Sequence, residues 1–109
     1  MTSRLRLAII GSGEIANFHV LAAKRAGFDV VDVAARKNSR TVRVFAQTHG
    51  IPQTSSDPFQ LIAEKDHWDA LIIAASTEAV IPLLTHAIEI GKPVLVEKPI
   101  ATTSAALIP

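Results

Sequence analysis

The stretch that decides the fold is Leu5–Ala16, which reads LRLAIIGSGEIA and joins an apolar run to a glycine turn. The run Leu5–Ile10 shows no solvent-facing alternation, which is typical of a central parallel strand covered on both faces. Glycines at 11 and 13 let the backbone bend sharply and approach a phosphate, which then sits on the N-terminus of the next helix. The stretch therefore predicts a strand, a phosphate-binding turn and a helix.

The same alternation of strand and helix continues along the chain. Further strands are predicted over Val30–Ala35, Ala70–Ala75 and Pro93–Val96. The predicted helices are one from Ile15 to a stop at Gly27, one capped by Asn38 or Ser39 and ended by Gly50, one begun by Asp57 and Pro58, and one capped by Ser76 or Thr77 and ended by Gly91. The sequence thus predicts one α/β domain over residues 1–109, a doubly wound parallel sheet of the Rossmann type.

Helical spacing of apolar residues supports these helices and, in two later ones, predicts which side chains face inward. In the first helix the apolar residues Ile15, Phe18, Leu21, Ala22 and Ala26 recur at this spacing. The inner faces of two later helices are predicted at Val42, Phe45 and Ala46, and at Val80, Leu83, Leu84, Ala87 and Ile88. Pro82 is expected in or near the first turn of the last helix, because proline cannot donate a backbone hydrogen bond.

Asp32 conflicts with this pattern, because it falls inside the second predicted strand. A sheet covered on both faces would bury an unpaired carboxylate at considerable cost. Either that face of the sheet is open or the acid has a partner.

Composition excludes several classes of protein. The chain has 109 residues, 49% of them hydrophobic, a net charge of +1 and no cysteine. One globular core is attainable, whereas disulfides, thiolate catalysis and a nucleic-acid partner are not expected. The apolar run after Arg6 is too short for a signal peptide or a membrane span, so a cytoplasmic protein is expected. His49, His67 and His86 show no metal-ligand spacing, so no metal site is expected.

A second informative stretch is Glu97-Lys98-Pro99, directly after the last predicted strand. It places an amine at the carboxyl end of a parallel strand, where ligands of open α/β sheets bind. With the glycine turn it indicates a nicotinamide dinucleotide site that has a functional lysine beside it.

Three motifs carry a resemblance that covers essentially the whole chain. They are Gly11-x-Gly13-x-Ile15-Ala16 with His19, Phe45-Ala46 with Gly50-Ile51, and the run Ile90–Ala101. On these residues the chain resembles the N-terminal nucleotide-binding domain of the glucose-fructose oxidoreductase, inositol dehydrogenase and MocA family (Gfo/Idh/MocA). The resemblance implies an NAD(P)-dependent oxidoreductase that moves hydride between nicotinamide and a carbinol or carbonyl, often on a sugar or cyclitol.

The resemblance also implies roles for individual residues. The turn that holds the pyrophosphate would consist of Gly11, Gly13, Glu14, Ile15 and Ala16, and the adenosine end would contact Arg36 and Lys37. The middle of the dinucleotide would contact Ala75, Ser76 and Thr77. The nicotinamide edge would contact Glu97, Lys98 and Pro99. Lys98 would be catalytic, because its amine can donate a hydrogen bond to developing alkoxide charge. Thr77 either contacts the cofactor or caps its helix, and Glu97 either orients Lys98 or only caps the strand end. His19 is interpreted as a packed, hydrogen-bonded residue.

Two departures from the family pattern bear on ligand choice. Family members that use NAD resemble an Ala-Asp-Arg pattern after the second strand, where this chain has Ala34-Ala35-Arg36-Lys37. An acid there would bind the ribose hydroxyls and repel a 2′-phosphate, whereas Arg36 can pair with one, so NADP is favoured over NAD. The alternative is that Arg36 and Lys37 are solvent-exposed residues at the start of a helix and have no role in ligand binding. The second departure is Ser76–Val80, which stands where many relatives have a Pro-Asn-x-x-His type pattern. The sequence therefore does not identify the substrate.

The family's second domain supplies the substrate pocket, and this chain is expected to lack it. We therefore expect the chain alone to bind a dinucleotide but to be inactive, and to meet a small-molecule substrate only with the missing domain. That domain also normally makes family subunits associate, so a homo-oligomer is possible. The alternative is a stand-alone or truncated dinucleotide-binding module without turnover. A nucleotide-sensing regulatory domain is a third possibility, although such domains usually resemble the acidic strand ending that is absent here.

Overall fold

The computed structural model describes residues 4–35, 39–55, 57–75 and 77–97, with only the backbone of 77 and 78. Five parallel strands form one sheet in the order β3-β2-β1-β4-β5. The strands are β1 (Arg6–Ile10), β2 (Asp29–Ala34), β3 (Gln53–Ser55), β4 (Ala70–Ile73) and β5 (Val94–Val96). The helices are α1 (Glu14–Arg25), α2 (Val42–His49), α3 (Pro58–Ala63) and α4 (Thr77–Ile90), with a short 3-10 helix over Lys65–His67. The doubly wound Rossmann-type prediction is confirmed.

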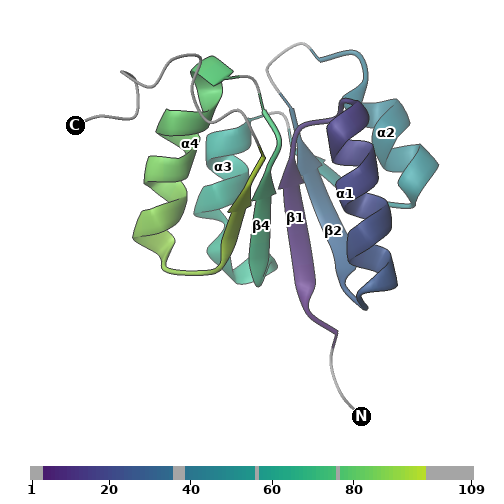
Figure 1. Ribbon diagram of the computed structural model, residues 1–109, viewed down its shortest axis with the longest axis horizontal. Coiled ribbons are helices and arrows are strands. Elements are labelled where there is room, and N and C mark those ends of the chain that lie inside the picture. Colours follow the sequence, from purple (N-terminus) through teal and green to yellow (C-terminus); the bar gives the residue numbers. More distant parts are fainter. Residues whose placement is uncertain (1–3, 36–38, 56, 76, 98–109) are drawn as a thin grey trace.

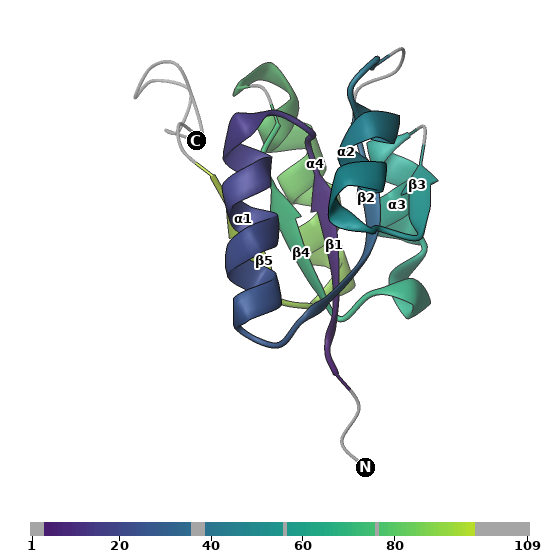
Figure 2. The same ribbon diagram turned by 90° about the vertical axis from the view of Figure 1, so that its right-hand side faces the viewer.

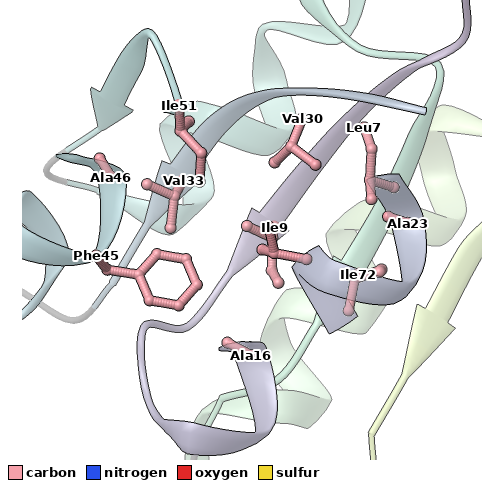
Figure 3. Packing of buried hydrophobic residues seen from close by; sticks show 11 residues of the cluster. Leu7, Ile9, Ala16, Ala23, Val30, Val33, Phe45, Ala46, Ile51 and Ile72 are labelled. Carbon is pink, nitrogen blue, oxygen red and sulfur yellow. The ribbon is translucent and has the colours of Figure 1, made fainter. Parts of the chain in front are cut away.

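Helices cover both faces of the sheet (Figure 1), with α1 and α2 on one face and α3 and α4 on the other. Alternate residues of β1 therefore enter different cores. Leu7 and Ile9 pack against residues of α1 and α2, and Phe45 of α2 belongs to the same buried cluster (Figure 3). Ala8 and Ile10 pack on the opposite side, where Trp68 is fully buried. Burial on both faces explains why β1 has no polar alternation.

Parallel pairing brings the carboxyl ends of the central strands to one edge. Ile10 at the end of β1 is in register with Ala34 of β2 and with Ile73 of β4. Figure 2 shows the turn after β1 and the start of α2 at this same edge of the sheet. No helix within the described ranges is long and apolar enough to cross a membrane.

The structure shows which faces of α1 and α4 are buried. Ile15, Phe18 and Leu21, whose spacing indicated α1, are 50%, 68% and 47% exposed, and the buried face of α1 is instead the smaller set Ala16, Val20 and Ala23. The inward prediction for Ile88 is wrong, because this side chain is 65% exposed. The stripe of α4 that packs on the sheet runs through Val80, Leu83 and Ala87 and is too narrow to include its neighbour Ile88.

Several element ends also shift. Strand β4 ends at Ile73 and not at Ala75, and the first residue N-terminal to α2 is Thr41 instead of Asn38 or Ser39. Pro82 lies inside α4, five residues after its first residue and thus close to the first turn. The start of α3 is as predicted, since Asp57 Oδ1 accepts a hydrogen bond from the backbone N–H of Phe59 at 2.9 Å.

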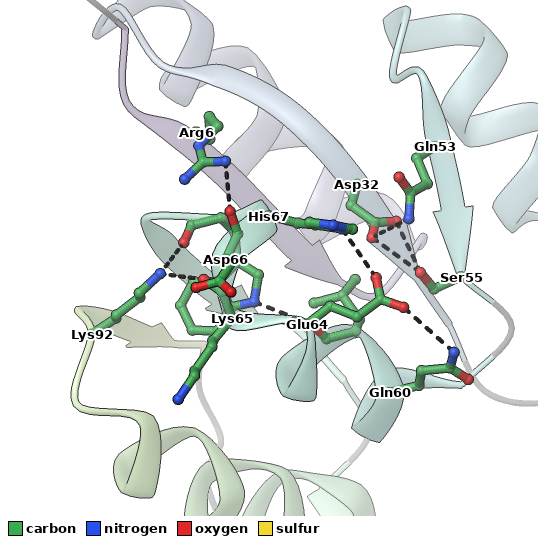
Figure 4. Close-up of polar contacts among 12 residues, drawn as sticks. Arg6, Asp32, Gln53, Ser55, Gln60, Glu64, Lys65, Asp66, His67 and Lys92 are labelled. Carbon is green, nitrogen blue, oxygen red and sulfur yellow. Dashed lines mark hydrogen bonds and ion pairs between the residues drawn. The ribbon is translucent and has the colours of Figure 1, made fainter.

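The partner of Asp32 comes from β3, a short strand that the sequence analysis did not predict. Ser55 Oγ lies 3.1 and 3.0 Å from the two carboxylate oxygens, and Gln53 Nε2 donates to Oδ2 at 3.2 Å (Figure 4). The side chain is 3% exposed, so the alternative with a partner is correct and the open face is not. Burial raises the pKa of Asp32 to about 6, although the hydrogen bond from Ser55 opposes this shift.

Candidate functional site

A cavity of about 460 Å³ opens at the carboxyl edge of the sheet. Its walls are the glycine turn after β1, the residues that lead from β2 into α2, and the residues that lead from β4 into α4. Ligands of doubly wound sheets bind at this edge, where the strand order reverses beside β1. The location therefore agrees with the site expected from the sequence.

Gly11 joins the end of β1 to the strands on both sides. Its backbone N–H donates to Ala34 O of β2 at 2.7 Å, and its φ of +119° is one that L side chains rarely adopt. A Cβ added at this position would lie 2.3 Å from the backbone oxygen of Ala74. The fold itself therefore requires glycine here, apart from any ligand.

Gly13 has different surroundings, although it lies only two residues further on. It is the N-cap of α1 with φ of −87°, and a Cβ added here would meet no protein atom within 4 Å. No side chain caps the first turn of α1 at this position. Free backbone N–H groups at a helix start attract an anion such as a pyrophosphate. Gly13 thus fits a position that a ligand, and not the fold, keeps free of a side chain.

The other predicted residues of the turn divide into two groups. Glu14 and Ile15 are exposed at the start of α1, whereas the side chain of Ala16 is fully buried in the core. Ala75 lines the cavity together with Gly11, and Thr77 is the first residue of α4. The remaining predicted site residues, Arg36, Lys37, Ser76, Lys98 and Pro99, lie outside the described residues.

Sequence reasoning missed one side of the cavity, which is formed by Ser39, Arg40 and Thr41. Thr41 Oγ1 lies 2.6 Å from Ser12 Oγ of the glycine turn and 3.2 Å from Ser39 Oγ. A signal for these residues was present, because they follow β2 at the edge where the glycine turn follows β1. The sequence analysis used Ser39 only as a candidate helix cap.

Glu97 lies at the end of β5, where its backbone N–H donates to Ile73 O of β4 at 2.9 Å. Its side chain reaches α1, where Oε2 contacts Nε2 of His19. Both side chains are partly buried, at 20% exposure for His19 and 32% for Glu97. His19 is therefore hydrogen-bonded as interpreted from the sequence, and its partner immediately precedes Lys98.

Comparisons with known proteins agree with this geometry. A family model described as an oxidoreductase family with an NAD-binding Rossmann fold, GFO_IDH_MocA, matches residues 5–108. The chain belongs to the Gfo/Idh/MocA family. This match covers nearly the whole chain and confirms the resemblance inferred from the sequence. The Gfo/Idh/MocA chain corresponds to the NAD-binding Rossmann domain of the family.

Individual relatives are enzymes about three times as long. The chain is 34% identical over 103 residues to inositol 2-dehydrogenase 1 of Saccharopolyspora erythraea, which covers 93% of this chain and 30% of that protein. It is 31% identical over 102 residues to a Bacillus subtilis protein named scyllo-inositol 2-dehydrogenase (NAD(+)), and this match covers 92% of this chain and 29% of that protein. A crystal structure of a probable dehydrogenase from Thermotoga maritima superposes with a TM-score of 0.81 at 25% identity, covering 93% and 30%. This Gfo/Idh/MocA chain thus spans about 30% of the length of these relatives.

Proposed function

We propose that this Gfo/Idh/MocA domain binds a nicotinamide dinucleotide in the cavity at the carboxyl edge of its sheet. It would serve an oxidoreductase that transfers hydride between the nicotinamide and a sugar, cyclitol or related carbinol or carbonyl. The observation that carries the proposal is the contrast within the glycine turn. Gly13 leaves open space at the start of α1, beside a cavity that packing has not filled.

The residues at this edge suit different parts of the ligand. Backbone N–H groups after Gly13 would bind the pyrophosphate, and Arg36 and Lys37 would meet the adenosine end. Ala75 through Thr77 would lie along the middle of the dinucleotide. When bound, the nicotinamide supplies the hydride chemistry, and the protein orients it. Lys98 would donate a hydrogen bond to the substrate oxygen as negative charge develops there.

We further propose a preference for NADP over NAD. Ala35 lines the cavity where an acid would bind the ribose hydroxyls, and it brings no carboxylate to repel a 2′-phosphate. The Bacillus subtilis relative is named as an NAD(+) enzyme, so the preference would distinguish this chain from that protein.

Titration of the 109-residue chain with NADPH and with NADH tests both proposals. We expect NADPH to bind about tenfold or more tightly at low salt, because an arginine and phosphate pair is a strong charge-assisted contact, and the ratio should shrink as salt rises. Equal affinities or an NADH preference would contradict the NADP assignment and leave the dinucleotide site intact. Failure to bind either cofactor would contradict the proposed function itself.

The second candidate is a binding module that takes up the dinucleotide without turnover. Both candidates bind the cofactor, so a turnover assay separates them. Within the oxidoreductase proposal, residues 1–109 by themselves bind the cofactor and show no turnover. NADPH oxidation by the isolated chain with a keto-sugar, above a cofactor-only control, would show a complete active site within these residues.

A further inference from the structure

Among the described residues Arg40 has no carboxylate partner, unlike Arg4 and Arg6. Arg4 pairs with Asp29 at 3.0 Å, and Arg6 pairs with Asp69 at 3.2 Å. Among the residues that the structure describes, Arg40 forms no hydrogen bond or ion pair, and it lines the cavity at the carboxyl edge. Its guanidinium is therefore available to a ligand in that cavity.

The part of the cavity around Arg40 suits an anion. No acidic residue is among the described residues that line this cavity, and Arg40 is the charged residue among them. The hydroxyl groups of Ser39 and Thr41 line it as well. A guanidinium fork beside hydroxyl donors is the chemistry that binds a phosphate, whose oxygens accept several hydrogen bonds at once.

Hydrogen bonds hold this loop against the glycine turn. Thr41 Oγ1 lies 2.6 Å from Ser12 Oγ, which joins the start of α2 to the turn after β1. The backbone N–H of Thr41 also donates to Ser39 Oγ at 3.3 Å. Thr41 thus links the two loops that would hold the adenosine end and the pyrophosphate.

The position of Arg40 along the fold selects which phosphate it meets. In a Rossmann fold the adenosine ribose lies at the end of the second strand, where an acid binds the 2′-hydroxyl or an arginine accommodates a 2′-phosphate. Here Ala35 directly follows that strand, and Ala35, Ser39 and Arg40 line the same cavity. The pyrophosphate, by contrast, is expected beside Gly13 at the start of α1.

We infer that Arg40 and the Ser39 hydroxyl bind the 2′-phosphate of NADP(H), and that Thr41 positions them through its contact with Ser12. This inference rests on the proposed function and adds to it two residues that select the cofactor. It predicts that the affinity for the phosphorylated cofactor depends on Arg40, while the affinity for NADH does not.

The experiment compares Arg40→Gln with Arg43→Gln in the 109-residue chain. Arg43 is exposed one residue after the start of α2 and lines neither this cavity nor the adjacent one beside Gly13, so its loss removes the same charge without the contact. Each variant and the unaltered chain are titrated with NADPH, NADH, adenosine 2′,5′-bisphosphate and adenosine 5′-monophosphate. Thermal unfolding of both variants checks that the exposed substitutions leave the fold intact.

We expect Arg40→Gln to weaken NADPH and the bisphosphate by about tenfold to a hundredfold, with NADH and the monophosphate within about twofold. Arg43→Gln should leave all four within about twofold, because exposed charges at a distance are screened. An unaltered NADPH preference in Arg40→Gln would overturn this inference alone. Equal weakening of NADPH and NADH, or equal effects of the two variants, would also overturn it. If the unaltered chain binds the nucleotides but does not prefer NADPH, the NADP assignment falls with it, and if it binds none, the proposed function falls.

Discussion

Gly11 and Gly13 lie in one turn, but one belongs to the packed sheet and the other to the open rim of the cavity. Gly11 has a positive φ and a backbone oxygen of Ala74 where its Cβ would be. Gly13 has an ordinary φ and open space in the same direction. The fold therefore requires the first glycine, whereas packing leaves room for a side chain at the second, where we propose that a ligand binds.

The same division separates other residues of the domain. On the packed side, Asp32 has partners supplied by strand pairing with β3. On the open side, Arg40 is exposed and has no ion-pair partner among the described residues. Substitutions on the packed side should change the free energy of unfolding, whereas substitutions on the open side should change ligand affinity.

The largest expected effect on stability is that of Gly11→Ala. The new Cβ would need to displace the backbone of Ala74, and alanine would be held at a strained positive φ. We therefore expect the free energy of unfolding to fall by more than about 3 kcal/mol. Urea denaturation measures it. The matched control is Gly27→Ala. Gly27 also has a positive φ, of +94°, but a Cβ added there would meet no atom within 4 Å, so the free energy of unfolding should fall by only about 1 kcal/mol. Similar losses for the two variants would contradict the close contact at Gly11.

A smaller and pH-dependent effect is expected for Asp32→Asn. The pKa of Asp32 is about 6 in the folded chain and 3.8 for a free aspartate side chain, so the unfolded chain releases this proton first as the pH rises. The stability contributed by the protonated acid is present below pH 4 and is lost as the pH rises through 6. Asparagine stays neutral, so the variant should gain about 1 to 3 kcal/mol at pH 8 and lose most of that gain at pH 4.

Urea denaturation at the two pH values checks this prediction, with Asp29→Asn as the control on the same strand. Asp29 is half exposed and paired with Arg4, so its loss should change stability by less than about 1 kcal/mol at either pH. A loss of stability in Asp32→Asn that is the same at pH 4 and pH 8 would contradict the raised pKa.

These comparisons also indicate how far the sequence alone could reach. Apolar runs predicted β1, β2 and β4, because a strand buried on both faces has a strong local signal. An apolar run also predicted β5, although this edge strand leaves Leu95 exposed. The three residues of β3 carry no such signal, since Gln53 and Thr54 are exposed and the strand is defined by its pairing with β2. The carboxylate of Asp32 could be recognised as a problem, but its partner depends on that tertiary pairing.

The candidate site was predictable to a similar extent. The glycine turn has a recognisable spacing, so its place at the carboxyl edge followed from the sequence. Arg40 and Thr41 have no motif of their own, and their place in the cavity depends on how the loop after β2 lies against Ser12. Likewise, nothing in the spacing of the two glycines distinguishes Gly11 from Gly13, because the distinction depends on Ala74, the residue directly after β4.

The central claim, that a dinucleotide and not the fold keeps position 13 free of a side chain, is tested most directly by Gly13→Val. Its effect on unfolding should be the smallest of those considered, within about 1 kcal/mol, because the side chain enters open space and only a modest N-cap preference is lost. The measurement is NADPH affinity by calorimetric titration of the variant and the unaltered chain, with urea denaturation of both. We predict that the valine variant folds with near-normal stability and loses at least about a hundredfold in NADPH affinity, since its side chain occupies the space of the pyrophosphate. A folded Gly13→Val variant that binds NADPH as tightly as the unaltered chain would contradict the account.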